Sequence, residues 1–567
     1  MTRRSSLILA CLGVLLLPAA ACPDSVDEPL PEGRPDPLST LAGTNTVRNV
    51  QGSDARGAAS RLSSERAPTP IRCSRGGLCR QLSAPISSGV DLLFVVDNSG
   101  SMAQEQASLR EQFPRMIRML TDGKRADGST FPPAHDVHLG VVSTDMGLLG
   151  QVTNFPMCNT QRSINGGDDG LLQHTGGAEP TCDATYPAFL EYAQGRDDPE
   201  KLARDFGCIA SLGTSGCGFE QPLESALKAL WPKSYVDSNG TVLPPEANPV
   251  LFLSTTGEGQ FGHGDTPPDM GGNAGFARND PTTGLSLLAI VVVTDEDDCS
   301  SGNTGHFAST NDPANPLSKQ GLNLRCFYNP QNLYALERYT IGYPNVRPNH
   351  QDTVRFAAIV GVPPDLVDAQ ARAGVDFEKP ASVNRYYDRI LRDARMKEVP
   401  QNENVPSIAT VAPSCTRTDR FQQPATAYPP RRIVQVAKSF GRNGMVQSIC
   451  QDDFGPAIDG LVDMMAKDVR AQCLPRPLKR RNDKVACDVI VEDGSGQHKL
   501  AQVPVHDGVV GSGEGFYYDD FSDEKRIRER KQPICGERPG VLITFTDEAR
   551  PPADARVYLD CDESAQD

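Results

Sequence analysis

Oxygen ligands follow one another in a short loop that comes directly after a strongly apolar segment. The run DLLFVV occupies residues 91–96, and Asp97, Ser99 and Ser101 come next at alternate positions. A carboxylate and two hydroxyls are donors of the kind that Mg²⁺ prefers, and such sites usually keep several waters and take one or two carboxylates. An ion held by so few protein charges stays electrophilic and can accept a further carboxylate. The loop is therefore a candidate divalent-metal site.

The loop must be positioned by regular secondary structure on both sides. In the surrounding sequence, apolar runs alternate with amphipathic stretches. Continuous apolar runs predict strands at 91–96, 138–143, 285–293, 356–362 and 445–449. Helices are expected within 109–120, 222–230, 331–339, 431–440 and 454–465, with a kink at Pro114 in the first. Strands that alternate with helices indicate an α/β fold with a mostly parallel sheet. Ligands of such open sheets bind beyond the carboxyl ends of the strands.

Residues 1–21 have the organisation of an export signal. Arg3 and Arg4 precede the apolar run 7–17, which is too short to span a bilayer. The small residues 19–21 and then Cys22 are similar to the lipobox of bacterial lipoproteins, although Ala19 stands where leucine is usual. The alternative is an ordinary secretory signal that is cleaved after the alanines. We expect export across the bacterial inner membrane and a lipid anchor on Cys22 in the cell envelope, at the outer membrane.

Composition excludes several classes of partner. The 567 residues include 72 acidic and 56 basic side chains, for a formal net charge of -16. A chain this acidic binds nucleic acid and anionic membranes poorly, so we expect no nucleic acid and membrane contact only through the N-terminal lipid. Residues 22–87 are rich in Pro, Ser and Gly and are expected to be a disordered tether behind the lipidated cysteine.

Sixteen cysteines point to an oxidising compartment. Cys11 leaves with the signal and Cys22 carries the lipid, so an even number remains and up to seven disulfides are expected. Their connectivity is open, with local pairing of Cys208 and Cys217 as one hypothesis. The candidates are Cys73, Cys79, Cys158, Cys182, Cys208, Cys217, Cys299, Cys326, Cys415, Cys450, Cys473, Cys487, Cys535 and Cys561.

The folded part is expected to have two regions. Residues 88–470 form the α/β domain, with long insertions near 145–219 and 233–283, where loop-forming residues dominate. Residues 471–567 contain short β-like runs and four cysteines, which predict a small disulfide-supported β-rich module.

The segments DLLFVVDNSGSM and VVVTDED, each after a core strand, resemble the von Willebrand factor type A (VWA) domain. The metal-ion-dependent adhesion site (MIDAS) of that family opens with Asp-x-Ser-x-Ser. The resemblance covers about residues 88–470 and implies a doubly wound, Rossmann-like, mostly parallel sheet. It makes Asp97, Ser99 and Ser101 metal ligands, adds Asp295 as a second acidic contributor, and implies Mg²⁺, or Mn²⁺ or Ca²⁺, as the ion.

The chain departs from the family pattern at two places. Gln221 occupies the position of the usual threonine, and Glu220 beside it either binds metal or caps the following helix. Glu296 replaces a glycine, and 296–298 either hold a second cation such as Ca²⁺ or face solvent, which we favour. Thr144 is a further oxygen donor, or simply part of a turn that ends the second strand.

The resemblance implies an adhesion or protein-binding module rather than an enzyme. Its metal would be completed by an acidic residue of a protein partner. Two alternatives remain: a structural or assembly protein that uses the VWA fold without metal, and a metal-dependent hydrolase, for which no general base is identifiable. His-Glu-x-x-His, Gly-x-Ser-x-Gly and Gly-Lys-Ser/Thr motifs do not occur in the sequence.

Overall fold

The computed structural model describes the chain between residues 79 and 561, with gaps. The gaps are 83–88, 126–127, 129–132, 135, 149–157, 159–166, 178–179, 254–258, 280–285, 308–315, 349, 378, 406, 419–423, 467–471, 475–477, 479, 482–483, 494–495, 507–508, 511–512, 520–540, 547–548 and 550–555. The predicted signal, Cys22 and most of the predicted tether lie outside the described residues. Within the described residues, no helix is long and apolar enough to cross a membrane.

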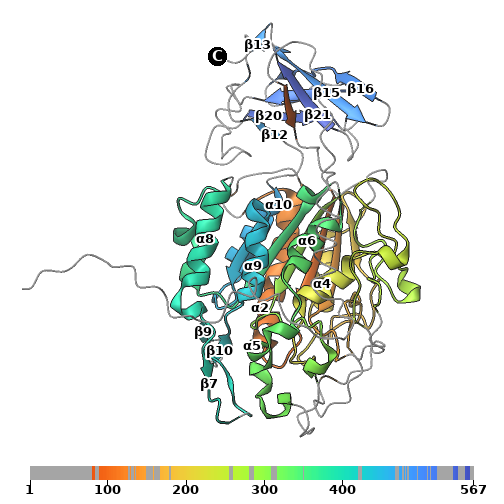
Figure 1. Ribbon diagram of the computed structural model, residues 1–567. Helices are drawn as coiled ribbons and strands as arrows, with labels where there is room; N and C mark the ends of the chain where they lie inside the picture. The colour runs from red at the N-terminus through yellow and green to blue at the C-terminus, as the bar shows by residue number, and fades with distance from the viewer. Residues whose placement is uncertain are drawn as a thin grey trace, which may run out of the picture. The chain divides into compact units, whose positions relative to one another are not determined.

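A six-stranded sheet forms the centre of the larger region (Figure 1), in the order β11-β6-β5-β2-β3-β4. Its strands are β2 (Gly89–Val96), β3 (Asp136–Ser143), β4 (Leu190–Ala193), β5 (Leu287–Val293), β6 (Val354–Val360) and β11 (Gly444–Ser448). All neighbouring strands are parallel except β4, which runs antiparallel to β3 at one edge. The prediction of a mostly parallel α/β sheet is confirmed.

Burial on both faces explains why the central strands are mostly apolar. Every residue of β2 and β5 is buried, as expected for parallel strands covered by helices on both sides; the one charged residue of β2, Asp91, is paired with two arginines. Alternate residues of β2 belong to two separate cores, one on each side of the sheet: Leu92 and Phe94 pack in one, and Leu93 and Val95 in the other.

Seven α-helices of nine or more residues surround the sheet, and shorter helical turns lie in the loops. The long helices are α2 (Ala103–Asp122), α3 (Pro199–Ile209), α4 (Pro222–Leu230), α6 (Glu337–Asn345), α8 (Pro380–Arg392), α9 (Arg431–Ser439) and α10 (Gly455–Ala466). The short ones are α5 (Arg325–Tyr328), α7 (Ala369–Arg372) and turns such as η4 (Thr304–Phe307). α2 continues through Pro114 and ends at Gly123, whose left-handed φ of 64° favours glycine.

The sheet places the carboxyl ends of β2 and β5 side by side. From β2 the chain proceeds outward to β3 and β4, and then returns to form β5 on the other side of β2. This reversal of strand order makes β2 and β5 the topological switch point, where open α/β sheets bind ligands. Val96 pairs with Val293, and the amide of Asp97 donates to the carbonyl of Val293 at 3.0 Å.

Part of the predicted insertion 145–219 belongs to the domain core, so that prediction is wrong for 190–209. This stretch forms β4 and α3, and Phe206 of α3 packs against Phe94 and Phe113 at ring-centroid distances of 5.1 and 4.3 Å. The segment 397–428, after α8, forms two small antiparallel pairs. They join β7 (Pro400–Gln401) to β8 (Thr410–Val411) and β9 (Cys415–Thr418) to β10 (Pro424–Ala427).

The C-terminal region is a β-rich module with a hydrophobic core of its own. Its main sheet has the order β1-β21-β15-β16, and a second sheet has the order β12-β20-β19. β1 (Cys79–Leu82) comes from the predicted tether, so the prediction of disorder is wrong for these four residues. The other strands are β12 (Gln472–Leu474), β13 (Arg480–Arg481), β14 (Lys484–Val485), β15 (Cys487–Asp493), β16 (Gly496–Leu500), β17 (Val505–His506), β18 (Val509–Val510), β19 (Phe516–Asp519), β20 (Val541–Phe545) and β21 (Arg556–Cys561).

Five disulfides lie within the described residues, and the expectation of disulfide pairing is confirmed for their ten cysteines. They join Cys158 to Cys217, Cys182 to Cys208, Cys299 to Cys326, Cys415 to Cys450, and Cys487 to Cys561. Local pairing of Cys208 with Cys217 is wrong, because each bonds to a cysteine further back in the chain. The pairing of Cys73, Cys79, Cys473 and Cys535 lies outside what the structure describes.

Candidate metal centre

Asp97 sits at the carboxyl end of β2 and is completely buried. Its Oδ1 accepts hydrogen bonds from the amide of Ser99 at 2.8 Å and from the hydroxyl of Thr144 at 3.4 Å. Its Oδ2 accepts one from the hydroxyl of Thr294 at 2.6 Å. Burial nevertheless raises the pKa of Asp97, because these bonds do not offset the lost hydration of the charge.

The two serine hydroxyls converge beside this carboxylate. Oγ of Ser99 lies 3.3 Å from Oγ of Ser101, and Ser101 is close enough to Asp295 to lower the pKa of that carboxyl, which burial and the charge of Asp97 nevertheless raise well above its usual range. Asp295 is only 3 % exposed, yet its Oδ1 has no hydrogen-bond partner within the described chain. A buried carboxylate oxygen without a partner costs folding free energy, so this atom is short of a donor or of a cation.

Glu220 joins the group from the loop before α4. It is 3 % exposed. Burial, together with the charges of Glu296, Asp97 and Asp295, raises its pKa well above the usual range. Glu296 lies near it, and the pKa of Glu296 is raised to about 7 by burial and by the charge of Asp97. Four carboxyl groups therefore lie close enough to disfavour one another's ionisation, an arrangement that a divalent cation would relieve.

This crowding predicts that Glu296→Gln stabilises the metal-free protein. A carboxyl whose folded pKa is raised loses stability as the pH increases from its unfolded value through its folded value. For Glu296 that window runs from the usual 4.5 to about 7, which corresponds to up to about 3 kcal/mol at pH 7. Urea denaturation in the presence of a chelator should show the gain at pH 7 and none at pH 4. An equal gain at both pH values would contradict the crowding.

Gln221 does not take the place of a metal ligand. Its Nε2 donates to the carbonyl of Gly147 at 3.4 Å, and its Oε1 accepts from the amide of Ser301 at 3.3 Å. The side chain thus joins two loops, and the acidic group contains Glu220 instead. Thr144 does lie beside Asp97, so the reading of it as only a strand-ending turn is wrong.

The acidic residues 296–298, which follow β5, do not all have the same role. Asp298 is 1 % exposed, so the expectation that 296–298 face solvent is wrong for it. Its Oδ1 accepts from the amide of Leu223 at 3.1 Å, and Ser300 Oγ accepts from that of Glu224 at 3.1 Å. These two residues cap α4, the alternative role considered for Glu220. Arg432 neutralises Asp298 through a 3.1 Å bond from its Nε.

Two residues of the site were not predicted. Thr294 was seen only as a neighbour of Asp295, yet its hydroxyl makes the shortest bond to Asp97. Gln106 of α2 donates from Nε2 to the carbonyl of Asp97 at 2.7 Å and to that of Gly213 at 2.9 Å. Its position one turn into the helix after the Asp-x-Ser-x-Ser loop is a signal that could have indicated this role.

A pocket of about 80 Å³ adjoins the acidic group. Its lining includes Glu220 and Glu296 from that group, Cys299 and Cys326, and Tyr428. The amide of Tyr428 donates to the carbonyl of Asp295 at 2.7 Å, so this wall of the pocket is attached to the site.

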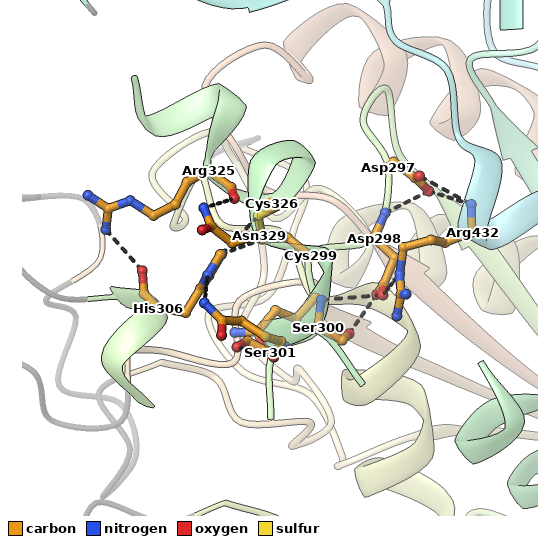
Figure 2. The surroundings of a disulfide bond; sticks show 12 residues. Asp297, Asp298, Cys299, Ser300, Ser301, His306, Arg325, Cys326, Asn329 and Arg432 are labelled. Atoms are coloured by element: carbon orange, nitrogen blue, oxygen red, sulfur yellow. Dashed lines mark hydrogen bonds and ion pairs between the residues drawn. A yellow bond between two sulfur atoms is a disulfide. The ribbon is translucent and has the colours of Figure 1, made fainter. Parts of the chain in front are cut away.

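A second cluster on this side of the domain contains softer ligands. Cys299, His306 and Cys326 offer ligand atoms that all lie within 4.8 Å of one another (Figure 2). The sulfurs are bonded to each other as a disulfide, and burial lowers the pKa of His306 to about 4. Sulfur and imidazole are not the ligands that Mg²⁺ or Ca²⁺ prefers, so this cluster does not add to the case for those ions.

The acidic group fits a hard divalent cation. Asp97, Ser99, Ser101, Asp295 and Glu220 supply carboxylate and hydroxyl oxygens, and Asp295 has an oxygen without a donor. Comparison of the chain with models of known protein families and with curated proteins gives no match. Fold and site define a mixed α/β protein that carries an acidic, hydroxyl-lined loop cluster at the switch point of a mostly parallel sheet.

Proposed function

We propose that this protein is a VWA-type lipoprotein of the bacterial cell envelope, which binds a protein partner through a divalent metal ion. The ion is Mg²⁺, with Mn²⁺ or Ca²⁺ as substitutes. The residues that hold it are Asp97, Ser99, Ser101 and Asp295, together with Glu220. An acidic residue of the partner completes its coordination. The partner binds at the loops after β2 and β5, and the N-terminal lipid on Cys22 keeps the protein at the outer membrane.

One observation carries the proposal: the buried Oδ1 of Asp295, which has no hydrogen-bond partner within the described chain. It belongs to a group of carboxyls whose pKa values are all raised, chiefly by burial. Burying several carboxyls without compensating cations is costly. A divalent ion at this place would keep them ionised and give Asp295 its missing partner.

The order of the strands supports the VWA assignment. With the strands numbered along the chain from β2, the sheet order is 3-2-1-4-5-6, and the third strand is the antiparallel edge β4. The Asp-x-Ser-x-Ser loop follows the first of these strands and Thr294-Asp295 follows the fourth, so both lie at the switch point. A VWA protein that works without metal would leave the unpaired carboxylate unexplained, and the second alternative, a metal-dependent hydrolase, still has no identifiable general base.

Partner capture tests the proposal. The purified protein is immobilised and incubated with detergent-solubilised envelope from the source bacterium, in buffer with Mg²⁺ or with chelator. We expect a protein that is retained with Mg²⁺, released by chelator and absent with Asp97→Ala. Asp269→Asn is the matched control, because Asp269 is exposed and the change in charge is the same. Equal retention by wild type and Asp97→Ala would show that any partner binds elsewhere.

A further inference from the structure

The Cys299–Cys326 disulfide lies next to the candidate metal centre in the chain and in space. Cys299 is four residues after Asp295, and its amide donates to the carbonyl of Glu220 at 2.8 Å. The residues between Asp295 and Cys299 include Asp298, whose carboxylate caps α4. The loop after β5 thus contacts both ends of the short segment that carries Glu220.

Arg432 and Cys326 hold the two ends of this loop, as Figure 2 shows. Arg432 binds one end, where its amide donates to Asp297 at 3.0 Å and its Nε to Asp298 at 3.1 Å. The disulfide to Cys326 of α5 holds the other end. Breaking the disulfide would remove the covalent anchor beside Glu220 and leave this end to hydrogen bonds, such as those of Ser300 and Ser301.

His306 distinguishes this disulfide chemically. The imidazole is completely buried, and its Nε2 lies 3.4 Å from Sγ of Cys326 and 3.8 Å from Sγ of Cys299. Nδ1 of His306 lies 3.2 Å from the side-chain nitrogen Nδ2 of Asn332 and accepts a hydrogen bond from it. The proton of the neutral imidazole is therefore on Nε2, which faces the sulfurs. Both cysteines line the pocket, but Cys326 is partly exposed whereas Cys299 is 4 % exposed. Cys326 is therefore the more accessible residue for a small thiol.

We propose that the Cys299–Cys326 disulfide is a redox-sensitive control of the metal centre, an inference that rests on the proposed function. The thiolate of a thiol or dithiol reductant attacks Sγ of Cys326, and the sulfur–sulfur bond breaks. Its electron pair passes to Sγ of Cys299, to which the N–H at Nε2 of His306 donates a hydrogen bond. A second reductant thiolate then displaces Sγ of Cys326 and yields the oxidised reductant, and the two protons of the reductant thiols protonate Cys299 and Cys326.

Reduction releases the loop that positions Glu220 and α4, and metal affinity falls. We expect a fall of about tenfold, the usual size of coupling between two sites. His306→Gln should slow the opening of this disulfide, because the leaving sulfur then loses the imidazole N–H that faces it and stabilises its charge. Alkylation of the thiols and peptide mass mapping would measure that rate directly.

The experiment compares two double variants of the full chain by calorimetric titration with Mn²⁺. Cys299→Ser/Cys326→Ser removes the proposed control, and Cys182→Ser/Cys208→Ser removes a disulfide whose sequence separation is 26 instead of 27. Both should lower the unfolding midpoint to a similar extent, because they release loops of similar length. Only the first should weaken Mn²⁺ binding, and mild treatment of the wild type with a dithiol should reproduce its effect.

The outcomes separate this inference from the proposed function. If the oxidised wild type binds no Mn²⁺, both fail. The second possibility is that the oxidised wild type binds Mn²⁺ and Cys299→Ser/Cys326→Ser binds it equally well, or that both double variants lose affinity alike. Either result would overturn the proposed redox control but leave the proposed metal centre intact. If the disulfide is reduced at the same rate in the wild type and in His306→Gln, the imidazole has no role in its reduction.

Discussion

Asp97→Ala should reduce the affinity of the protein for Mn²⁺ by more than about 100-fold, the upper range for losing even an indirect contact to a metal. The carboxylate accepts hydrogen bonds from the amide of Ser99 and from the hydroxyl of Thr294, so it is held at the end of β2 beside the proposed ligands. Isothermal titration calorimetry measures the loss. Asp269→Asn, with an exposed side chain and the same change in charge, should bind Mn²⁺ like the wild type.

Thermal unfolding gives a second readout of the same variant. A ligand that binds only the folded state stabilises it by RT ln(1 + [L]/Kd), so saturating Mn²⁺ should raise the unfolding midpoint of the wild type. The metal-free Asp97→Ala protein should remain folded, because the substitution removes a buried charge whose pKa is raised. A midpoint that rises equally with Mn²⁺ in wild type and variant would contradict the assignment of Asp97.

Arg338→Ala should destabilise the α/β domain by about 3–5 kcal/mol, the usual cost of breaking a buried ion pair. Arg338 and Glu224 are 5 % and 4 % exposed, and two bonds of 2.8 Å join them. Truncation leaves the Glu224 carboxylate buried, with the Tyr339 hydroxyl, 3.0 Å away, as its remaining side-chain partner within the described residues. The pair joins α4 to α6, so the effect measures how firmly the helix after Glu220 is held.

Urea denaturation followed by tryptophan fluorescence checks this prediction. The chain has one tryptophan, Trp231, which is completely buried at the end of α4. Arg395→Ala is the control: its guanidinium binds Asp365 and Asp393 at the surface, where such pairs contribute about 1 kcal/mol or less. If the two variants unfold at the same urea concentration, the buried pair does not hold α4.

Continuous runs of apolar residues made the central strands of the sheet predictable from the sequence. β5 is apolar over all of its seven residues, and β2 and β6 each contain one charged residue in an otherwise uncharged run, because both faces of these strands are buried; such runs stand out in a sequence. β4 was not predicted, because it has only four residues at the edge of the sheet, and its alternate residues face solvent. α8 was missed because its buried face combines two tyrosines with Val383 and Ile390, and polar residues occupy most of the other positions.

The site was predictable where it depends on strand ends and unpredictable where it depends on contacts distant in sequence. Asp97 and Asp295 follow adjacent strands, so sequence alone places them together. Glu220 and Glu296, which influence each other's pKa, lie on two loops 76 residues apart, and the choice of Glu220 over Gln221 depends on how the loop before α4 turns. The hypothesis of a Cys208–Cys217 disulfide was wrong for the same reason, because Cys217 bonds to Cys158, 59 residues away, instead of to the nearer Cys208.

A crystal of the oxidised protein soaked in Mn²⁺ and measured for anomalous scattering tests the central claim most directly. The account predicts a peak bonded to the hydroxyls of Ser99 and Ser101, at about 2.0–2.4 Å, with Asp97 and Asp295 around it. The same soak of Asp97→Ala crystals should show no such peak. Wild-type crystals without a peak at these hydroxyls, or with one only beside Cys299 and His306, would contradict the account.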